Sequence, residues 1–195
     1  MDTSFSLDRA LDATGALLAR RGQQAAIVVV GGTALNLLGV VDRVTRDVDV
    51  IATATVRRDG EPGAIRPPDP LPAPLAEVVA TVARDLGLPL DWLNTTVGGQ
   101  WSTGLPPGFA GRISWQRHGG LWIGLAGRTD LIYLKLYAAA DDIGPASRHV
   151  KDLVALRPTV KELAAGRAWV ESQDPSPAMA EALQRVIAHV QAEGR

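Results

Sequence analysis

The sequence contains no cysteine, only two methionines, and few aromatic residues, which make up 5% of its 195 positions. Without cysteine the chain cannot form disulfides, zinc–thiolate sites or a thiol nucleophile. No apolar run reaches the roughly 20 residues that a membrane-spanning helix needs, and charged residues interrupt the first 21 positions. We therefore expect no membrane segment, no signal peptide and a cytoplasmic location.

An excess of charge of either sign is also missing, because 20 basic and 21 acidic residues leave a formal net charge of −1. Such a chain has no overall field that would draw it to nucleic acid or to an anionic membrane. Any nucleic-acid site therefore has to be a local basic patch. The apolar fraction of 46% is ordinary for a folded protein, and 195 residues can form one domain with a real hydrophobic core.

Hydrophobic patterning in the first 111 residues predicts helices and strands in alternation. The predicted elements are a helix at Ser6–Arg21, a buried strand at Ala25–Val30, a short helix at Thr33–Gly39, a strand at Asp47–Thr55 and a helix at Leu75–Leu86. The segments 59–74 and 97–111 are rich in proline and glycine, which predicts loops.

The remainder begins with a strand pair and then becomes helical. The pattern predicts strands at Arg112–Trp115 and Leu121–Ala126, joined through His118-Gly119-Gly120. It then predicts a helix that is capped by Asp130 and runs to about Ile143, and a helical turn at Lys151–Leu156. A capping box from Thr159 to Glu162 starts another helix, and a last helix begins at Pro177. The fold class is therefore α/β (α+β): a small mixed sheet with helices in residues 1–128, and a helical region in residues 129–195 that packs on it.

Two carboxylates, Asp47 and Asp49, are the most informative pair in the sequence. Side chains at positions i and i+2 of a strand project from the same face. Two carboxylates held close together repel each other, so the position favours a cation. Mg²⁺ takes oxygen ligands and is usually bound by one or two carboxylates together with substrate phosphates. Taken alone, the pair could equally belong to a solvated strand face.

A glycine pair lies just upstream, where the strand at 25–30 runs into Gly31-Gly32-Thr33 at the start of a helix. Small residues at such a place let backbone N–H groups approach a phosphate. By itself a Gly-Gly pair after a strand is more often an ordinary turn. In this order and spacing the two patterns support each other, since one would line the phosphates and the other would hold the metals for in-line attack on phosphorus.

The stretch Val28–Val50 resembles the first motif of nucleotidyltransferase-fold proteins, the polymerase-β-like superfamily. Its form, Gly-Gly-Thr-Ala-Leu followed by Arg-x-Thr-x-Asp-x-Asp at positions 43–49, is similar to the AbiEii toxin type and related nucleotidyltransferase-like families. Such proteins often occur in bacterial toxin–antitoxin pairs. The helical segment Leu131–Leu156 is similar to that group's Lys…Lys-Asp-Leu pattern, with Lys135 and then Lys151-Asp152-Leu153.

The resemblance implies a nucleotidyltransferase that uses Mg²⁺ or Mn²⁺ and a nucleoside triphosphate. The implied catalytic residues are Asp47, Asp49, Lys135 and Asp152, with Asp47 and Asp49 as metal ligands and with Gly31, Gly32, Thr33, Arg43, Thr45 and Lys135 at the nucleotide. Independently of the resemblance, Lys135 lies among apolar helix positions, so it needs an anionic partner or must reach solvent. Asp152 could instead pair with Lys151, Arg148 or Arg157 on a solvated helix.

The sequence departs from the superfamily pattern in two respects. The usual serine after the first glycine is replaced by Gly32, so Thr33 or backbone N–H groups would have to bind the phosphate. Many members use a third carboxylate on a neighbouring strand as general base, and neither predicted strand at 112–115 or 121–126 contains one. Asp91 and Asp130 remain by elimination, and Asp152 could substitute from the helical part. This departure leaves room for a non-catalytic protein that binds a nucleotide or a partner without turnover.

The resemblance suggests an RNA, such as the tRNA 3′ end, or a protein side chain as the acceptor, and a possible antitoxin as partner. Two groups of basic residues could bind RNA. They are Arg43, Arg46, Arg57 and Arg58 near the site, and Arg112, Arg117 and Arg128 further along. An antibiotic-like small molecule is the alternative acceptor, and a polycation would need an acidic pocket, for which Asp141-Asp142 is the available pair.

Overall fold

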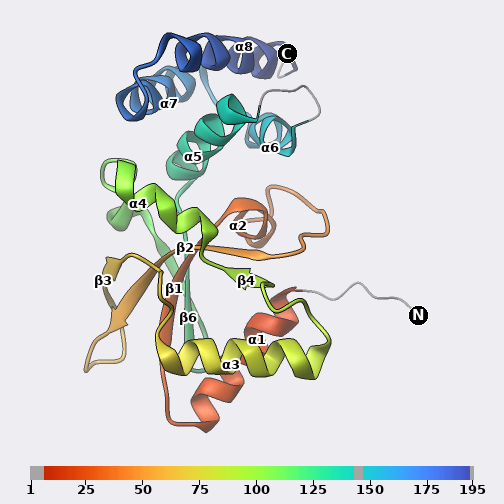
Figure 1. Ribbon diagram of the computed structural model, residues 1–195, viewed down its shortest axis with the longest axis vertical. Coiled ribbons are helices and arrows are strands. Elements are labelled where there is room, and N and C mark those ends of the chain that lie inside the picture. The colour runs from red at the N-terminus through yellow and green to blue at the C-terminus, as the bar shows by residue number, and fades with distance from the viewer. Residues whose placement is uncertain (1–6, 143–146, 194–195) are drawn as a thin grey trace.

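The computed structural model describes residues 7–142 and 147–193, so the predicted helix ends at Ser6 and Ile143 lie outside the described residues. A mixed sheet forms one part of the molecule, and a stack of helices lies across one end of it (Figure 1). The strands are β1 (Ala25–Val30), β2 (Val48–Val56), β3 (Pro62–Arg66), β4 (Leu93–Asn94), β5 (Ser114–His118) and β6 (Leu121–Leu125). The helices are α1 (Leu7–Arg20), α2 (Gly31–Leu37), α3 (Ala73–Leu86), α4 (Gln100–Thr103), α5 (Arg128–Asp141), α6 (Arg148–Leu156), α7 (Val160–Gln173) and α8 (Pro177–Glu193), with 3₁₀ turns η1 (Thr96–Gly99) and η2 (Phe109–Arg112).

The described strands form a sheet in the order β3-β2-β1-β6-β5, with β4 added to the edge of β2. The central strand β1 pairs antiparallel with β2 and parallel with β6. All six residues of β1 are buried, so the side chains on both faces of this strand are covered. A continuous run of alanine, isoleucine and valine is the composition that such a doubly covered strand requires.

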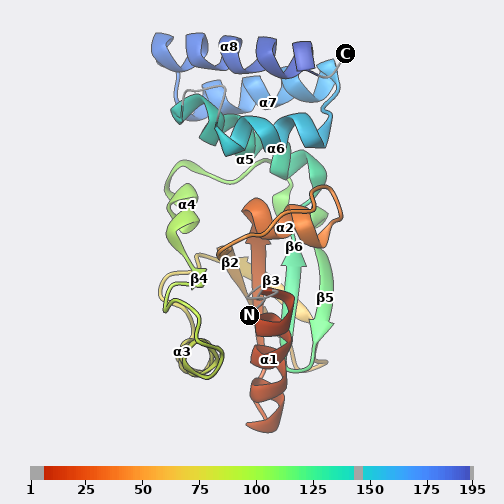
Figure 2. The same cartoon turned by 90° about the vertical axis from the view of Figure 1, so that its right-hand side faces the viewer.

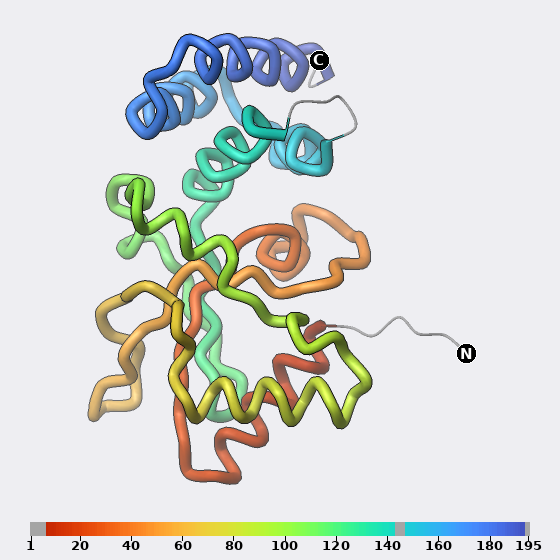
Figure 3. Tube along the Cα trace, in the orientation of Figure 1, coloured from red at the N-terminus to blue at the C-terminus, as the bar shows by residue number. Residues whose placement is uncertain are grey.

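Helices α1 and α3 pack against each other along one part of the sheet, whereas α5, α6, α7 and α8 are stacked at the opposite end (Figure 2). Between the sheet and this stack runs the segment that contains β4, η1 and α4, shown in yellow-green in Figure 3. The arrangement confirms the predicted α/β fold class with a mixed sheet and a helical C-terminal part. In the described parts of the chain no helix is both long and apolar enough to cross a bilayer.

Most predicted elements are confirmed within one or two residues, but the segment 59–74 is not the loop that its prolines suggest. It contains β3, which forms an antiparallel ladder with β2. Proline is tolerated at the start of an edge strand, where its missing N–H removes no ladder bond. Similarly, the predicted loop at 97–111 contains short helical turns, and β5 begins and ends later than predicted, at Ser114 and His118.

The predicted cap at Asp130 is wrong, because α5 begins at Arg128 and no side chain caps its start at Gly127. Asp130 is fully buried and accepts hydrogen bonds from Arg112, whose Nε lies 3.0 Å from Asp130 Oδ2. This pair joins the end of η2 to the first turn of α5. By contrast, the predicted capping box of Thr159 and Glu162 is present at α7.

Replacing Arg112 by alanine is expected to lower the free energy of unfolding by about 3 kcal/mol, because it leaves the buried Asp130 carboxylate without its cation. Urea unfolding followed by circular dichroism measures the loss. The matched control is Arg128→Ala, which removes a pair with Glu162 in which both side chains are partly exposed and which is worth less than about 1 kcal/mol. Equal losses in the two variants would show that burial of Asp130 does not set the energy of its pair.

Candidate active site

Asp47 and Asp49 flank Val48, the first residue of β2, at the end of the strand that faces the helical stack. Val48 is fully buried, so the strand is anchored between the two carboxylates. The backbone of Asp47 is held by Thr33, whose hydroxyl donates to the Asp47 carbonyl oxygen over 2.7 Å. Thr33 is itself buried. Its observed contact therefore positions the aspartate segment from the first turn of α2.

The turn from β1 into α2 passes directly beside the Asp49 carboxylate. Gly31 has a φ of +71°, and a Cβ added there would overlap Asp49 Oδ2 and lie 3.1 Å from Asp49 Cγ. A Cβ at Gly32 would approach the side chains of Thr45, at 2.9 Å, and Arg43, at 3.0 Å. Glycine is thus required at the first position both for its backbone conformation and for the close approach.

Lys135, Asp152 and Arg43 form an ion-pair cluster that joins the helical stack to the sheet. Lys135 Nζ lies 2.7 Å from Asp152 Oδ2, and Arg43 Nη2 lies 2.9 Å from Asp152 Oδ1. Only 2% of Asp152 and 6% of Lys135 are exposed, so both charges are buried and paired. Asp152 therefore does not lie on a solvated helix face with Lys151, Arg148 or Arg157. Its carboxylate holds the side chains of Lys135 and Arg43 in place through these two salt bridges.

A polar chamber of about 510 Å³ opens in front of these residues. It is lined by Gly32, Arg43, Val44, Thr45, Arg46, Asp47, Asp49, Asp91, Asn94, Thr96, Val97, Lys135, Arg148 and His149. The basic side chains come from the loop before β2 and from α5 and α6. The two predicted metal ligands, Asp47 and Asp49, line the same chamber. Charges of both signs therefore meet in one cavity.

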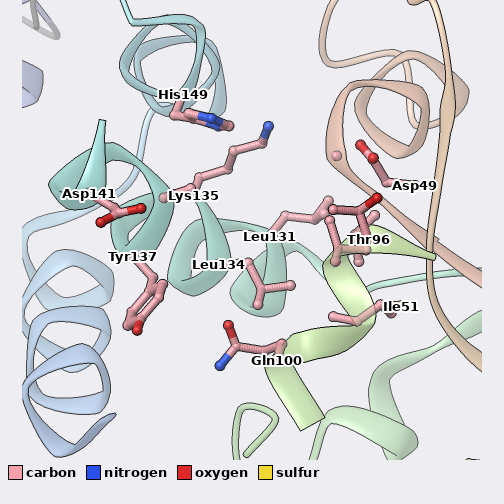
Figure 4. A pocket seen from close by; sticks show the side chains of 14 residues that line it. Asp49, Ile51, Thr96, Gln100, Leu131, Leu134, Lys135, Tyr137, Asp141 and His149 are labelled. Atoms are coloured by element: carbon pink, nitrogen blue, oxygen red, sulfur yellow. The ribbon is translucent and has the colours of Figure 1, made fainter. Parts of the chain in front are cut away.

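A second, apolar chamber of about 410 Å³ continues from the first. It is lined by Val30, Gly31, Asp49, Ile51, Thr96, Val97, Gln100, Leu131, Leu134, Lys135, Tyr137, Ala138, Asp141 and His149. Figure 4 shows Lys135 extending between His149 on α6 and Asp49 on the sheet, with Leu134 and Tyr137 on one side. Asp49, Thr96, Val97, Lys135 and His149 border both chambers.

Burial, and then the charge of Asp47, raise the pKa of Asp49 above its ordinary value. A hydrogen bond from Asn94 and the charges of Lys135 and Arg148 act in the opposite direction. Two carboxylates that repel each other in a partly buried place fit a divalent cation, because its charge would remove the repulsion. The oxygen donors of Asp47 and Asp49 are of the type that Mg²⁺ prefers.

His149 lies at the border of the two chambers and has no partner for its buried Nδ1 among the described residues. Burial lowers the pKa of His149, and the neighbouring positive charges of Lys135 and Arg148 lower it further. The lowered pKa favours the neutral imidazole, so the positive charge of the polar chamber comes from Arg43, Arg46, Lys135 and Arg148.

Within residues 7–142 and 147–193, no group of three histidine or carboxylate side chains could hold a metal together. Asp130 is committed to Arg112 and Asp152 to Lys135 and Arg43. Asp91 reaches the polar chamber but joins no such group. The neighbouring strand β4 instead places an amide there, because Asn94 is the ladder partner of Asp49 and its Nδ2 lies 3.5 Å from Asp49 Oδ1.

The structure brings most of the predicted site residues together and separates two of them from the cavities. Asp47, Asp49, Gly31, Gly32, Arg43, Thr45 and Lys135 line one or both chambers, whereas Thr33 and Asp152 lie behind their walls. Asn94 and Arg148 also belong to the site and are not among the residues predicted from the sequence. Arg148 belongs to the helical pattern around Asp152, which could have indicated it, but a two-residue strand leaves no local signal for Asn94.

The basic groups that were expected to attract RNA are largely neutralised. Salt bridges join Arg43 to Asp152, Arg57 to Asp59, Arg112 to Asp130 and Arg128 to Glu162. Arg117 lies over the ring of Trp122. Of the acidic pair expected for a polycation, Asp141 lines the apolar chamber and Asp142 accepts a hydrogen bond from Ser147. Arg46, another member of the first group, lines the polar chamber together with Lys135 and Arg148.

A mixed sheet with two carboxylates at the end of an inner strand, facing a cavity with basic walls, is an arrangement suited to binding a metal-bound polyphosphate. Residues 8–59 match the model of a family described as "Nucleotidyltransferase of unknown function (DUF6036)". The matched stretch contains β1, the Gly31-Gly32 turn, Asp47 and Asp49, so this part of the chain is similar to a nucleotidyltransferase family. The match does not extend to the AbiEii type in particular. Searches of the curated proteins and of the solved structures find no match.

Proposed function

We propose that this chain transfers a nucleoside monophosphate from a nucleoside triphosphate to an acceptor hydroxyl and releases pyrophosphate. The observation that carries the proposal is the meeting of Asp47 and Asp49 with Lys135 and Arg148 in one chamber. Carboxylates that can hold a divalent cation and cations that can hold phosphate oxygens are the two requirements for binding a metal-complexed triphosphate.

Asp47 and Asp49 would hold Mg²⁺ or Mn²⁺, which when bound would neutralise phosphate charge and favour attack at phosphorus. Lys135 is held in place by Asp152 and presents its side chain to both chambers. It is the group we assign to the phosphate next to the reacting bond. Arg148 binds the outer phosphates of the leaving pyrophosphate, and burial of the cluster excludes water from one side of the reacting atoms.

The resemblance to AbiEii-type toxins makes an RNA such as tRNA, or a protein side chain, the first acceptors to test, with an antitoxin as a further partner. A small-molecule acceptor comes second. A non-catalytic, nucleotide-binding role is favoured by a separate observation. Among the described residues no third carboxylate joins Asp47 and Asp49, and Asn94 occupies the neighbouring strand position.

The test is incubation of the purified chain with Mg²⁺, each α-labelled nucleoside triphosphate in turn, and total RNA. We expect label to move to RNA or to protein, and we expect Asp47→Ala to reduce transfer by at least about a hundredfold, because it removes a metal ligand. Gel electrophoresis with scintillation counting measures the transfer. The matched control is Asp59→Ala, an exposed carboxylate on the turn between β2 and β3 that lines neither chamber.

Transfer by the Asp47→Ala variant at the wild-type rate would contradict the assignment of this residue. If the wild type bound Mg²⁺–triphosphate and labelled no RNA, protein or small-molecule acceptor, the non-catalytic role would replace the transferase. Absence of both binding and transfer would overturn the proposed function as a whole.

A further inference from the structure

The two chambers differ in chemistry on opposite sides of Asp49 and Lys135. The polar chamber holds Arg43, Arg46 and Arg148, whereas these arginines are absent from the wall of the apolar chamber. A nucleoside triphosphate has the same asymmetry, with a charged tail on one side of its α-phosphate and a flat, largely apolar base on the other. If the α-phosphate lies at the border residues, the tail and the base are each matched by one chamber.

The walls of the apolar chamber suit a planar ring. Leu134 and Tyr137 project from α5, and Ile51 lies on the opposite side (Figure 4). Tyr137 is supported from behind by Trp169, with ring centroids 6.3 Å apart and the rings tilted to each other. Such a supported aromatic side chain offers a rigid surface for a base. None of the five tryptophans lines either chamber, and Tyr137 is the aromatic side chain in the wall of the apolar chamber that could stack on a base.

Gln100 provides a polar group with a defined direction. Its Nε2 donates to the hydroxyl of Thr103 over 2.7 Å and to the carbonyl oxygen of Gly104 over 3.1 Å. A carbonyl oxygen can only accept, so the orientation of the Gln100 amide is fixed and both of its N–H groups are used. The amide oxygen points to the side of Leu134, as Figure 4 shows, and acts there as an acceptor.

The Asp141 carboxylate also lines this chamber, and it too accepts hydrogen bonds. A base with an exocyclic amino group, as in adenine, cytosine or guanine, can donate to such acceptors. Uracil has one ring N–H flanked by two carbonyl oxygens, which would face the same acceptors and lose their hydration without a partner.

We infer that the apolar chamber is the nucleobase site of this chain, and that Gln100 and Asp141 select nucleoside triphosphates whose base carries an exocyclic amino group. This inference rests on the proposed function, since it takes the α-phosphate to lie at Asp49 and Lys135. The sugar then passes the border formed by Thr96 and Val97, and the triphosphate extends into the polar chamber.

The position of the base is tested with Ala138→Trp, because Ala138 lines the apolar chamber and not the polar one. Calorimetry in Mg²⁺ compares binding of inorganic tripolyphosphate with binding of ATP, CTP and GTP. We expect the variant to bind tripolyphosphate like the wild type and the best nucleotide about a hundredfold more weakly, since the tryptophan fills the space of the base. The matched control is Ala80→Trp on the exposed side of α3.

Base selection is tested with two comparisons of binding affinity. The first compares UTP with ATP, CTP and GTP. The second compares GTP with inosine triphosphate, which lacks the exocyclic amino group of GTP. We expect UTP to bind about tenfold more weakly than the best of the three, which corresponds to ~1.4 kcal/mol. In Gln100→Met, which removes the acceptor, this difference should shrink to about twofold. Thr103→Val is the control, because it removes one anchor of Gln100 and leaves the acceptor oxygen and the bond to Gly104.

The possible outcomes separate the two proposals. If Ala138→Trp is folded and binds nucleotides and tripolyphosphate as the wild type does, the base does not occupy the apolar chamber, although the proposed function stands. Equal binding of all four nucleotides, or selection for UTP, overturns the role of Gln100 and Asp141. Failure of the wild type to bind tripolyphosphate and every nucleotide overturns the proposed function itself.

Discussion

Replacing Gly31 by alanine is expected to abolish nucleotidyl transfer and to destabilise the fold. The residue has a φ of +71°, and the added Cβ would overlap the Asp49 carboxylate, so Asp49 or the β1–α2 turn must move. The left-handed backbone alone costs an alanine about 1–2 kcal/mol. Displacing a metal-binding carboxylate by about 1 Å should lower activity at least a hundredfold. Chemical unfolding and the labelled-transfer assay measure the two effects.

Gly39 provides a matched control for this prediction. Its φ is +67°, almost the same as that of Gly31, but an added Cβ would meet no atom within 4 Å. Gly39→Ala should therefore show the cost of backbone strain alone and keep its response to Mg²⁺. The difference between the two variants reports the contact with Asp49. If both lose the same stability and both retain transfer, the turn does not hold Asp49 in place.

Replacing Asp49 by asparagine is expected to stabilise the metal-free protein by about 1 kcal/mol while removing its metal site, a trade that functional sites commonly show. Burial and the charge of Asp47 disfavour the ionised form of Asp49, and an uncharged amide avoids both costs. Thermal unfolding with and without Mg²⁺ measures the change. The wild type should gain stability from the cation, and Asp49→Asn should not.

The pH dependence of the metal-free wild type follows from the same shift. A carboxyl group whose folded-state pKa is raised makes the folded state less stable as pH rises from the unfolded value, 3.8 for Asp49, to the raised one. The cost is complete above the raised pKa and is relieved as pH falls through it. Protons also compete with Mg²⁺ for the Asp49 carboxylate, so the affinity for Mg²⁺ should decrease as pH falls through the raised pKa. Asp49→Asn should lack both effects.

Asp59→Asn is the control, because its shift has the opposite sign. A hydrogen bond from the Glu61 backbone, and then one from Arg57, lower the pKa of Asp59. The ionised form is favoured in the folded state, so neutralising it should not stabilise the protein and should leave the response to Mg²⁺ unchanged. A stabilisation equal to that of Asp49→Asn would point to a general effect of net charge instead of repulsion at the metal site.

How much of the fold is visible in the sequence depends on how local the signals are. The continuous apolar run of β1, the helical spacing in α3 and the capping box at Thr159 all lie within a few neighbouring residues, and all three predictions are confirmed. The strand β3 is different, because its proline-rich sequence becomes a strand only through pairing with β2. Similarly, β4 is two residues long and exists through its ladder with the start of β2.

The candidate site follows the same division. Asp47, Asp49 and the Gly31-Gly32 turn were identified from spacing, because strand and turn geometry relate residues that are close along the chain. The partner of Asp152 could not be identified in this way. Its salt bridge to Arg43 spans 109 positions, and spacing along a chain does not determine which of several basic residues will be near.

The sequence by itself determined that this chain has an α/β core with a carboxylate pair beside a glycine turn, since backbone geometry imposes these relations locally. Only the tertiary structure decided that Lys135 is buried against Asp152, that Asn94 stands beside Asp49, and that two chambers of different polarity meet at Asp49. Burial and electrostatic environment depend on which surfaces pack together. Those contacts form between segments that are far apart in sequence, so no local pattern can specify them.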